Sequence, residues 1–281
     1  MNTKKNIIWI IVAVIVIIGI YYFVKSSSNS VTVTNNQNVS TTTIPVGTAT
    51  TTQNKPSEVI GQSAGGRDIT AYHYGTGTDE ILFIGGIHGS YDANTITLAN
   101  DLMNYLKANP GVIPANEKVT VIPALNMDGY KGDTGRFNAN NVDLNRNFDC
   151  DWQANAVWQD KAVSGGSAVF SEPESQAFKN YVTNNNPKAV VAYYSAAGGV
   201  FASNCHTGIL PETSKLVKAY AQASGYPAYQ SFDFYATTGD LTNWLAKINV
   251  PAVSILLTNH TSTEWTKNLA GIQAMLEYYG K

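Results

Sequence analysis

Short apolar segments alternate with longer helical patterns through most of this chain. This alternation predicts an α/β fold, a mixed and largely parallel central sheet flanked by helices on both faces. In such folds, ligands bind past the carboxyl ends of the central strands. The expected strands are Asp68–Gly75, Glu80–Ile84, Lys118–Pro123, Lys188–Tyr194 and Ala252–Leu257. The expected helices are Asn94–Lys107, Glu172–Asn184, Pro211–Ser224, Thr238–Lys247 and Thr263–Tyr279.

The N-terminal segment, residues 1–25, has a different pattern. An apolar run extends from Ile7 to Val24, with Lys4 and Lys5 before it and Lys25 after it. A helix of this length spans roughly 27 Å, enough to cross the hydrocarbon core of a bilayer. A cleaved signal peptide would have a shorter apolar region and a small-residue exit. We therefore predict a single-pass membrane anchor, with the following chain on the extracytoplasmic side.

Residues 26–57 are rich in Ser, Thr, Asn and Gln and contain almost no charged residues. Such a segment buries too little apolar surface to offset its chain entropy, which indicates a flexible linker. A globular domain is then expected over residues 58–281. The net charge of the chain is −2, which gives no electrostatic basis for binding nucleic acid.

The loop 135–149 carries two arginines and several asparagines, in a chain where only 14% of residues are charged. Arginine binds carboxylates through two parallel hydrogen bonds, and asparagine adds a neutral donor. The loop could therefore recognise an anion. The alternative is that Arg136 and Arg146 pair with the neighbouring Asp143 and Asp149 and serve the structure alone.

An ordered set of motifs then resembles the zinc carboxypeptidase family over about residues 58–280. Asp-Leu-Asn-Arg-Asn-Phe, at residues 143–148, is the most specific part of the set. The motifs are Gly61-Gln62-Ser63 with Gly66-Arg67, Gly85-Gly86-Ile87-His88-Gly89, Asn126-Met127-Asp128-Gly129, Val142-Asp143-Leu144-Asn145-Arg146-Asn147-Phe148, Tyr235 with Trp244, Pro251-Ala252-Val253, and Glu264-Trp265.

The resemblance implies a carboxypeptidase A-like fold and a zinc ion held by two His and one Glu, with a further Glu as general base. It also implies residues that bind the substrate. Asn145 and Arg146 match the pair that binds the terminal carboxylate, Arg136 the arginine that stabilises the oxyanion, and Tyr235 the tyrosine that closes over the substrate. The implied partner is a peptide with a free C-terminal carboxylate.

The residues that would bind zinc and activate water match the family pattern only in part. His88 corresponds to the first zinc ligand, and the acidic ligand is expected within one helical turn, where Asp92 is the candidate. The second His is replaced by Tyr194 and the general base by Leu256. His88 and Asp92 supply two ligands where a catalytic zinc site uses three. Weak or absent zinc binding is therefore expected.

Two cysteines, Cys150 and Cys205, follow segments that border the predicted site. In an extracytoplasmic domain they are expected to form a disulfide.

Three hypotheses follow. The first is a membrane-tethered pseudo-carboxypeptidase that binds peptide C-termini without efficient hydrolysis. The second is an active zinc metallocarboxypeptidase with a non-standard metal site made with Asp92 and Tyr194 and with a base outside the family pattern. Glu264 and His260 lie near the missing base, but a helix-start role and a loop role are favoured for them. The third is a structural surface protein whose pocket holds no ligand.

Overall fold

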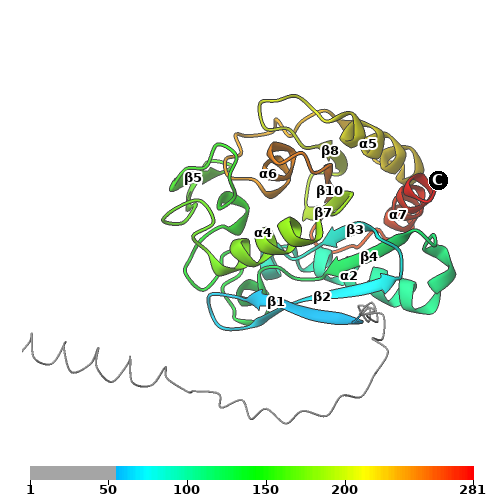
Figure 1. Cartoon of the computed structure of the whole chain (residues 1–281). Helices are drawn as coiled ribbons and strands as arrows, with labels where there is room; N and C mark the ends of the chain where they lie inside the picture. Colours follow the sequence, from blue (N-terminus) through cyan, green and yellow to red (C-terminus); the bar gives the residue numbers. More distant parts are fainter. Residues whose placement is uncertain (1–54) are drawn as a thin grey trace, which may run out of the picture. The chain divides into compact units, whose positions relative to one another are not determined.

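The computed structural model describes residues 55–281 (Figure 1). The predicted anchor, 1–25, and nearly all of the linker, 26–57, lie outside the described residues. Across residues 55–281, no helix combines the length and apolar character that crossing a membrane requires.

Eight strands form one mixed sheet in the order β1-β2-β4-β3-β7-β10-β8-β9. The four central strands, β4, β3, β7 and β10, run parallel to one another; β2 and β8 pair antiparallel with them on either side, β1 is antiparallel to β2, and β9 is parallel to β8. A short hairpin, β5–β6, stands apart. The bounds are β1 Ser57–Gln62, β2 Asp68–Gly75, β3 Asp79–Ile84, β4 Glu117–Ile122, β5 Asn155–Trp158, β6 Lys161–Ser164, β7 Ala189–Ser195, β8 Gly199–Ala202, β9 Ala228–Tyr229 and β10 Ala252–Leu257.

Helices cover both faces of this sheet, as predicted (Figure 1). Helices α2, α5 and α7 pack on one face, and α4 and α6 pack on the other. The helices are α2 Ala93–Ala108, α3 Met127–Lys131, α4 Pro173–Asn185, α5 Pro211–Ser224, α6 Leu241–Lys247 and α7 Trp265–Tyr279, with 3-10 turns η1 Gly89–Asp92, η2 Pro110–Val112 and η3 Leu144–Arg146.

The central strand β3 shows why its sequence is almost wholly apolar. Ile81 and Phe83 belong to the core under α2, α5 and α7, whereas Leu82 and Ile84 belong to the core under α4 and α6. Successive side chains of a strand point to opposite faces, so a strand covered on both sides has no polar face. The same alternation places Tyr193 and Tyr194 of β7 in different cores.

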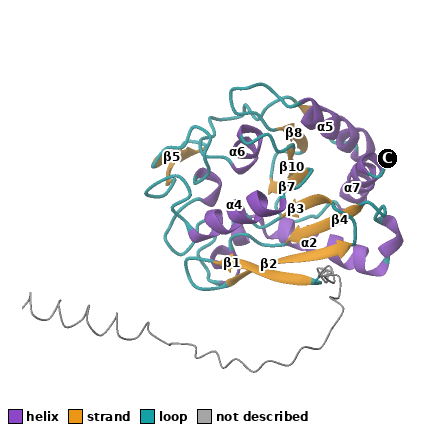
Figure 2. Cartoon of the chain, viewed as in Figure 1, coloured by secondary structure: helices purple, strands orange, loops and turns teal. Residues whose placement is uncertain are grey.

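The predicted elements occur with small shifts at their ends. The largest shift is in α6, expected from Thr238, which begins at Leu241 because Asp240 is its N-cap and accepts a hydrogen bond from the Asn243 amide. Figure 2 shows long loops around β5, β8 and α6, on the part of the domain that carries the candidate site.

Candidate functional site

A cavity of about 270 Å³ lies past the carboxyl ends of β3, β7 and β10. Five of the six predicted site residues line it: His88, Arg136, Asn145, Arg146 and Tyr235. The fold therefore brings together residues that are separated by almost 150 positions in the chain. The sixth predicted residue, Asp92, lies behind His88 and contacts it directly.

His88 and Asp92 form a buried pair. His88 Nδ1 lies 2.7 Å from Asp92 Oδ2, and Asp92 Oδ1 lies 3.2 Å from Nδ1 of His260 on the cavity rim. His88 Nε2 lies 3.7 Å from Asp143 Oδ1. Burial and the nearby Arg136 charge lower the pKa of His88, although Asp92 and Asp143 act in the opposite direction. The imidazole is therefore held mainly in its neutral form.

Two of the zinc ligands that the resemblance implies, His88 and Asp92, are in contact with each other. Over residues 55–281, one group of three His, Cys, Asp or Glu ligand atoms lies within 4.8 Å of one another, and it is Cys150, Cys205 and His206. Its two cysteines are joined in a disulfide and offer no thiolate. His88 and Asp92 are not part of such a group.

Tyr194 and Leu256 occupy the positions expected for the second zinc ligand and the general base. They are neighbours in the parallel pairing of β7 with β10, and both line the cavity. Burial and the negative charge of Asp240 raise the pKa of Tyr194 well above its usual value. The phenol therefore keeps its proton, and its hydroxyl donates to Asn145 Oδ1 at 3.2 Å. A leucine side chain has no group that could transfer a proton.

Arg136 is committed to an ion pair. Its Nε and Nη2 both lie 2.9 Å from Asp143 Oδ2, and its guanidinium stacks 4.3 Å from the ring centre of Trp158. Burial by itself would raise the pKa of Asp143, but Arg136, His88 and Arg146 hold it below its ordinary value. The pairing alternative was therefore correct for Arg136 and Asp143. It was wrong for Asp149, which pairs with Lys247 instead.

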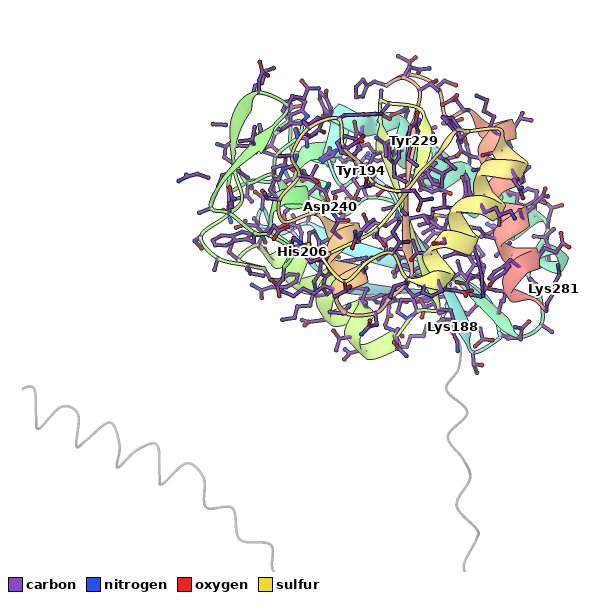
Figure 3. The ribbon with its side chains drawn as sticks, turned by 90° about the horizontal axis from the view of Figure 1, so that it is seen from above. Lys188, Tyr194, His206, Tyr229, Asp240 and Lys281 are labelled. Atoms are coloured by element: carbon purple, nitrogen blue, oxygen red, sulfur yellow. A yellow bond between two sulfur atoms is a disulfide. The ribbon has the colours of Figure 1, made fainter. Side chains whose placement is uncertain are left out.

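Asn145 is held by three groups. Its Oδ1 accepts from Tyr194 and from the Leu241 amide at 3.0 Å, and its Nδ2 donates to Asp240 Oδ2 at 2.9 Å. Figure 3 labels Tyr194 and Asp240, which flank this site, together with Lys188, which lies toward the opposite end of β7. Asp240 was not predicted as a site residue, because the helix was expected to begin at Thr238 and so to include it, whereas Asp240 is the N-cap of α6.

Arg146 forms no ion pair with a carboxylate among the described residues, although it is almost fully buried, with 1% of its surface exposed. Its Nε donates to the Val157 carbonyl at 2.9 Å and its Nη1 to the Asn145 carbonyl at 2.8 Å. Its Nη2 finds no hydrogen-bond acceptor among residues 55–281, and within that range no carboxylate forms an ion pair with Arg146. A buried cation therefore lines the cavity with no carboxylate of the described residues at ion-pair distance, although its charge still acts on Asp143.

Tyr235 lies beside this cation. Burial raises the pKa of Tyr235, and the positive charges of Arg146 and Arg136 oppose that rise. The same wall of the cavity carries Phe201, Phe232 and the half-exposed Phe234. These rings were not predicted as site residues, although the aromatic run before Tyr235 was a signal.

The predicted disulfide between Cys150 and Cys205 is confirmed, with their Cα atoms 6.0 Å apart. The Cys150 carbonyl also accepts a hydrogen bond from the Gly239 amide, and the Gly239 carbonyl accepts one from the Phe148 amide at 3.0 Å. Gly239 has a φ of 63°, and a Cβ there would lie 2.2 Å from the Arg146 carbonyl oxygen. Only glycine lets this segment pack so closely against Arg146.

A family model described as zinc carboxypeptidase matches residues 49–279. Murein peptide amidase A of Escherichia coli K12 is 27% identical over 183 residues, which is 62% of this chain and 69% of that protein. Human carboxypeptidase D is 38% identical over a shorter stretch of 86 residues, which is 26% of this chain and 6% of that protein.

Solved structures show the same fold. The murein-tripeptide amidase of Escherichia coli O157 superposes with a TM-score of 0.62 at 24% identity, covering 79% of this chain and 91% of that one. The thrombin activatable fibrinolysis inhibitor gives a TM-score of 0.68 at 15% identity, covering 80% of this chain and 69% of that one. At these identities the likeness concerns the fold alone.

Proposed function

The chain belongs to the zinc carboxypeptidase family, and from this premise we propose that it binds the free C-terminal carboxylate of a peptide without efficient zinc-dependent hydrolysis. Arg146 is the principal donor to the carboxylate, and Asn145 and Tyr235 complete the pocket. The ligand class follows from the family, whose members act on peptides.

The observation that carries this proposal is Nη2 of Arg146, a buried donor with no acceptor among the described residues and no carboxylate at ion-pair distance. A buried charge is costly unless a partner of opposite charge compensates for it. A carboxylate that enters the cavity would accept from Nη2 and supply the missing negative charge, in the charge-assisted geometry that arginine favours. Arg136 is already neutralised by Asp143 and leaves this role to Arg146.

Efficient hydrolysis is not expected because residues of the family's metal-binding and proton-transfer pattern are replaced. Tyr194 and Leu256 supply neither the second imidazole nor the general base of the family pattern. Loss of a general base alone typically lowers a rate by roughly 10²–10⁴-fold. With His88 and Asp92 in contact with each other, the pocket retains the groups that bind a carboxylate and lacks those that activate water.

Similarity to murein peptide amidase A points to a cell-wall peptide as the ligand. Such peptides lie outside the cytoplasm, where the predicted anchor over residues 1–25 would place the domain. A disulfide is also typical of that compartment. We therefore propose a membrane-tethered extracytoplasmic protein.

Isothermal titration of the full chain with one short peptide, as the free acid and as the C-terminal amide, tests the proposed function. We expect the acid to bind at least tenfold more tightly, because the amide carries no charge to offset that of Arg146. Equal affinities would refute the carboxylate pocket and favour a structural surface protein.

A second function, active zinc-dependent release of C-terminal residues, has one observation in its favour. Asp92 contacts both His88 and His260, which brings three side chains of ligand type to one side of the cavity. This alternative predicts one tightly bound zinc per chain and peptide cleavage that a chelator abolishes. Elemental analysis after exchange into metal-free buffer and zinc back-titration distinguishes it from the first.

A further inference from the structure

Tyr194 stands where the family resemblance places a zinc-binding histidine, yet its hydroxyl is hydrogen-bonded on the opposite side, to the carboxylate-binding residues. Only 5% of its surface is exposed. Its hydroxyl lies 3.2 Å from Asn145 Oδ1, and its ring lies 5.6 Å, between ring centres, from that of His88. Tyr194 thus lies between His88, the residue expected to bind a metal, and Asn145, a residue expected to bind a carboxylate.

The contacts continue from Asn145 to the cation. The side chain of Asn145 is fixed by Tyr194, Asp240 and the Leu241 amide, and its main-chain carbonyl accepts from Arg146 Nη1 at 2.8 Å. That hydrogen bond and the one from Nε to the Val157 carbonyl define the plane of the guanidinium. They leave Nη2 as the donor without a partner among the described residues.

We propose that Tyr194 is a positioning residue of the carboxylate pocket, whose hydroxyl holds Asn145 so that the Asn145 carbonyl orients Arg146 toward a bound anion. This inference rests on the proposed function and goes beyond it, because it gives the replaced zinc-ligand position a role in binding. Restoring histidine there would weaken carboxylate binding, since an imidazole is too short to reach Asn145 from β7.

Tyr194→Phe tests the role by removing one oxygen atom and keeping the ring. The matched control is Tyr193→Phe, the same change in the adjacent residue, whose side chain lies in the core on the other face of the sheet. Each variant of the full chain is titrated with the free-acid peptide and with its amide, and its melting temperature is measured.

We expect Tyr194→Phe to lower affinity for the acid about five- to tenfold, which corresponds to one lost hydrogen bond. Affinity for the amide should stay within about twofold, and Tyr193→Phe should leave the ratio of acid to amide affinity unchanged. A merely structural role would lower both affinities together with the melting temperature. The ratio is therefore the informative readout.

If the wild type prefers the acid and Tyr194→Phe keeps the same ratio, the positioning role is wrong while the proposed function stands. If the wild type does not prefer the acid, the proposed function fails and this inference fails with it. Nuclear magnetic resonance of the ligand-free protein gives a second measurement that needs no binding. The Asn145 side-chain amide and Arg146 Nε–H signals should shift in Tyr194→Phe and not in Tyr193→Phe, and unchanged signals would overturn the inference.

A third variant, Tyr194→His, tests whether this position serves the carboxylate pocket or a metal site. We expect no stoichiometric zinc in this variant by elemental analysis, and weaker binding of the free acid. Stoichiometric zinc together with undiminished affinity for the acid would show that the position belongs to a metal site rather than to the carboxylate pocket.

Discussion

Arg136 and Arg146 both line the cavity, but only Arg136 forms an ion pair with a carboxylate of the described residues. Arg136 meets a buried carboxylate with two nitrogen atoms, so its charge is compensated within the domain. Arg146 meets only carbonyl oxygens, and no carboxylate among residues 55–281 lies at ion-pair distance from it. Two similar side chains, ten positions apart in one loop, are therefore expected to respond differently to the same substitution.

Glu117 is another buried charged residue with side-chain atoms that find no hydrogen-bond partner among the described residues, and it differs from Arg146 because it can become neutral. It is buried at the start of β4, and neither of its carboxylate oxygens finds a hydrogen-bond donor among the described residues. Burial and the nearby Asp79 raise the pKa of Glu117 from 4.5 to about 7, so the acid can take up a proton and become neutral. An arginine cannot lose its proton in a protein, so only an anion can neutralise Arg146.

Arg136→Met should have the largest effect, and it should be on stability. The substitution leaves Asp143 charged and buried without its partner, which typically costs about 3–5 kcal/mol. Urea unfolding of the full chain measures this change in the free energy of unfolding. A loss below about 1 kcal/mol would contradict the view that this ion pair is internally compensated.

Arg146→Met should change binding more than stability. Affinity for the free-acid peptide should fall roughly a hundredfold, because a charge-assisted contact to the ligand is lost. The amide, measured by the same titration, is the internal control and should change little. A drop in stability as large as that of Arg136→Met, with affinity retained, would reverse the assignment of the two arginines.

The buried carboxyl group of Glu117 predicts how the stability of the domain depends on pH. The folded-state pKa of Glu117 lies above its ordinary value, so its contribution to stability is complete below about pH 4.5 and is lost as pH rises through about 7. Glu117→Gln removes this dependence. Melting temperatures of wild type and variant should therefore diverge most above pH 7, with the variant higher. A constant difference across that range would show that Glu117 stays charged in the folded protein.

Zinc should have the smallest effect. We expect neither excess zinc nor a chelator to change the melting temperature or the affinity for the free-acid peptide. Binding of zinc to the folded state would instead stabilise the domain in proportion to the logarithm of its concentration. A concentration-dependent rise in melting temperature, lost in His88→Ala, would support the active-enzyme alternative.

Much of the fold followed from the sequence because hydrophobic periodicity is a local property. The elements Asp68–Gly75, Pro211–Ser224 and Ala252–Leu257 occur with the predicted bounds. Strands β1, β8 and β9 and the hairpin β5–β6 were missed, because short segments of mixed composition carry too few repeats for a period to be recognised.

The site was predictable in its composition and less so in its pairing. The motifs singled out His88, Arg136, Asn145, Arg146 and Tyr235, which the fold brings to one cavity, and the roles assigned to them stay predictions. Sequence could not decide which carboxylate would neutralise which arginine, because that depends on contacts between segments far apart in the chain. The contact of Asp240 with Asn145, across 95 positions, is of this kind.

The disulfide has a topological consequence. Cys150 and Cys205 are separated by 55 positions, and the chain between them includes the hairpin β5–β6, helix α4 and strands β7 and β8. With the sulfur bridge, this segment is a closed covalent ring. A single backbone cut anywhere within it would open the ring without dividing the molecule. The two loops that the bridge joins beside the cavity would remain tethered to each other after such a nick.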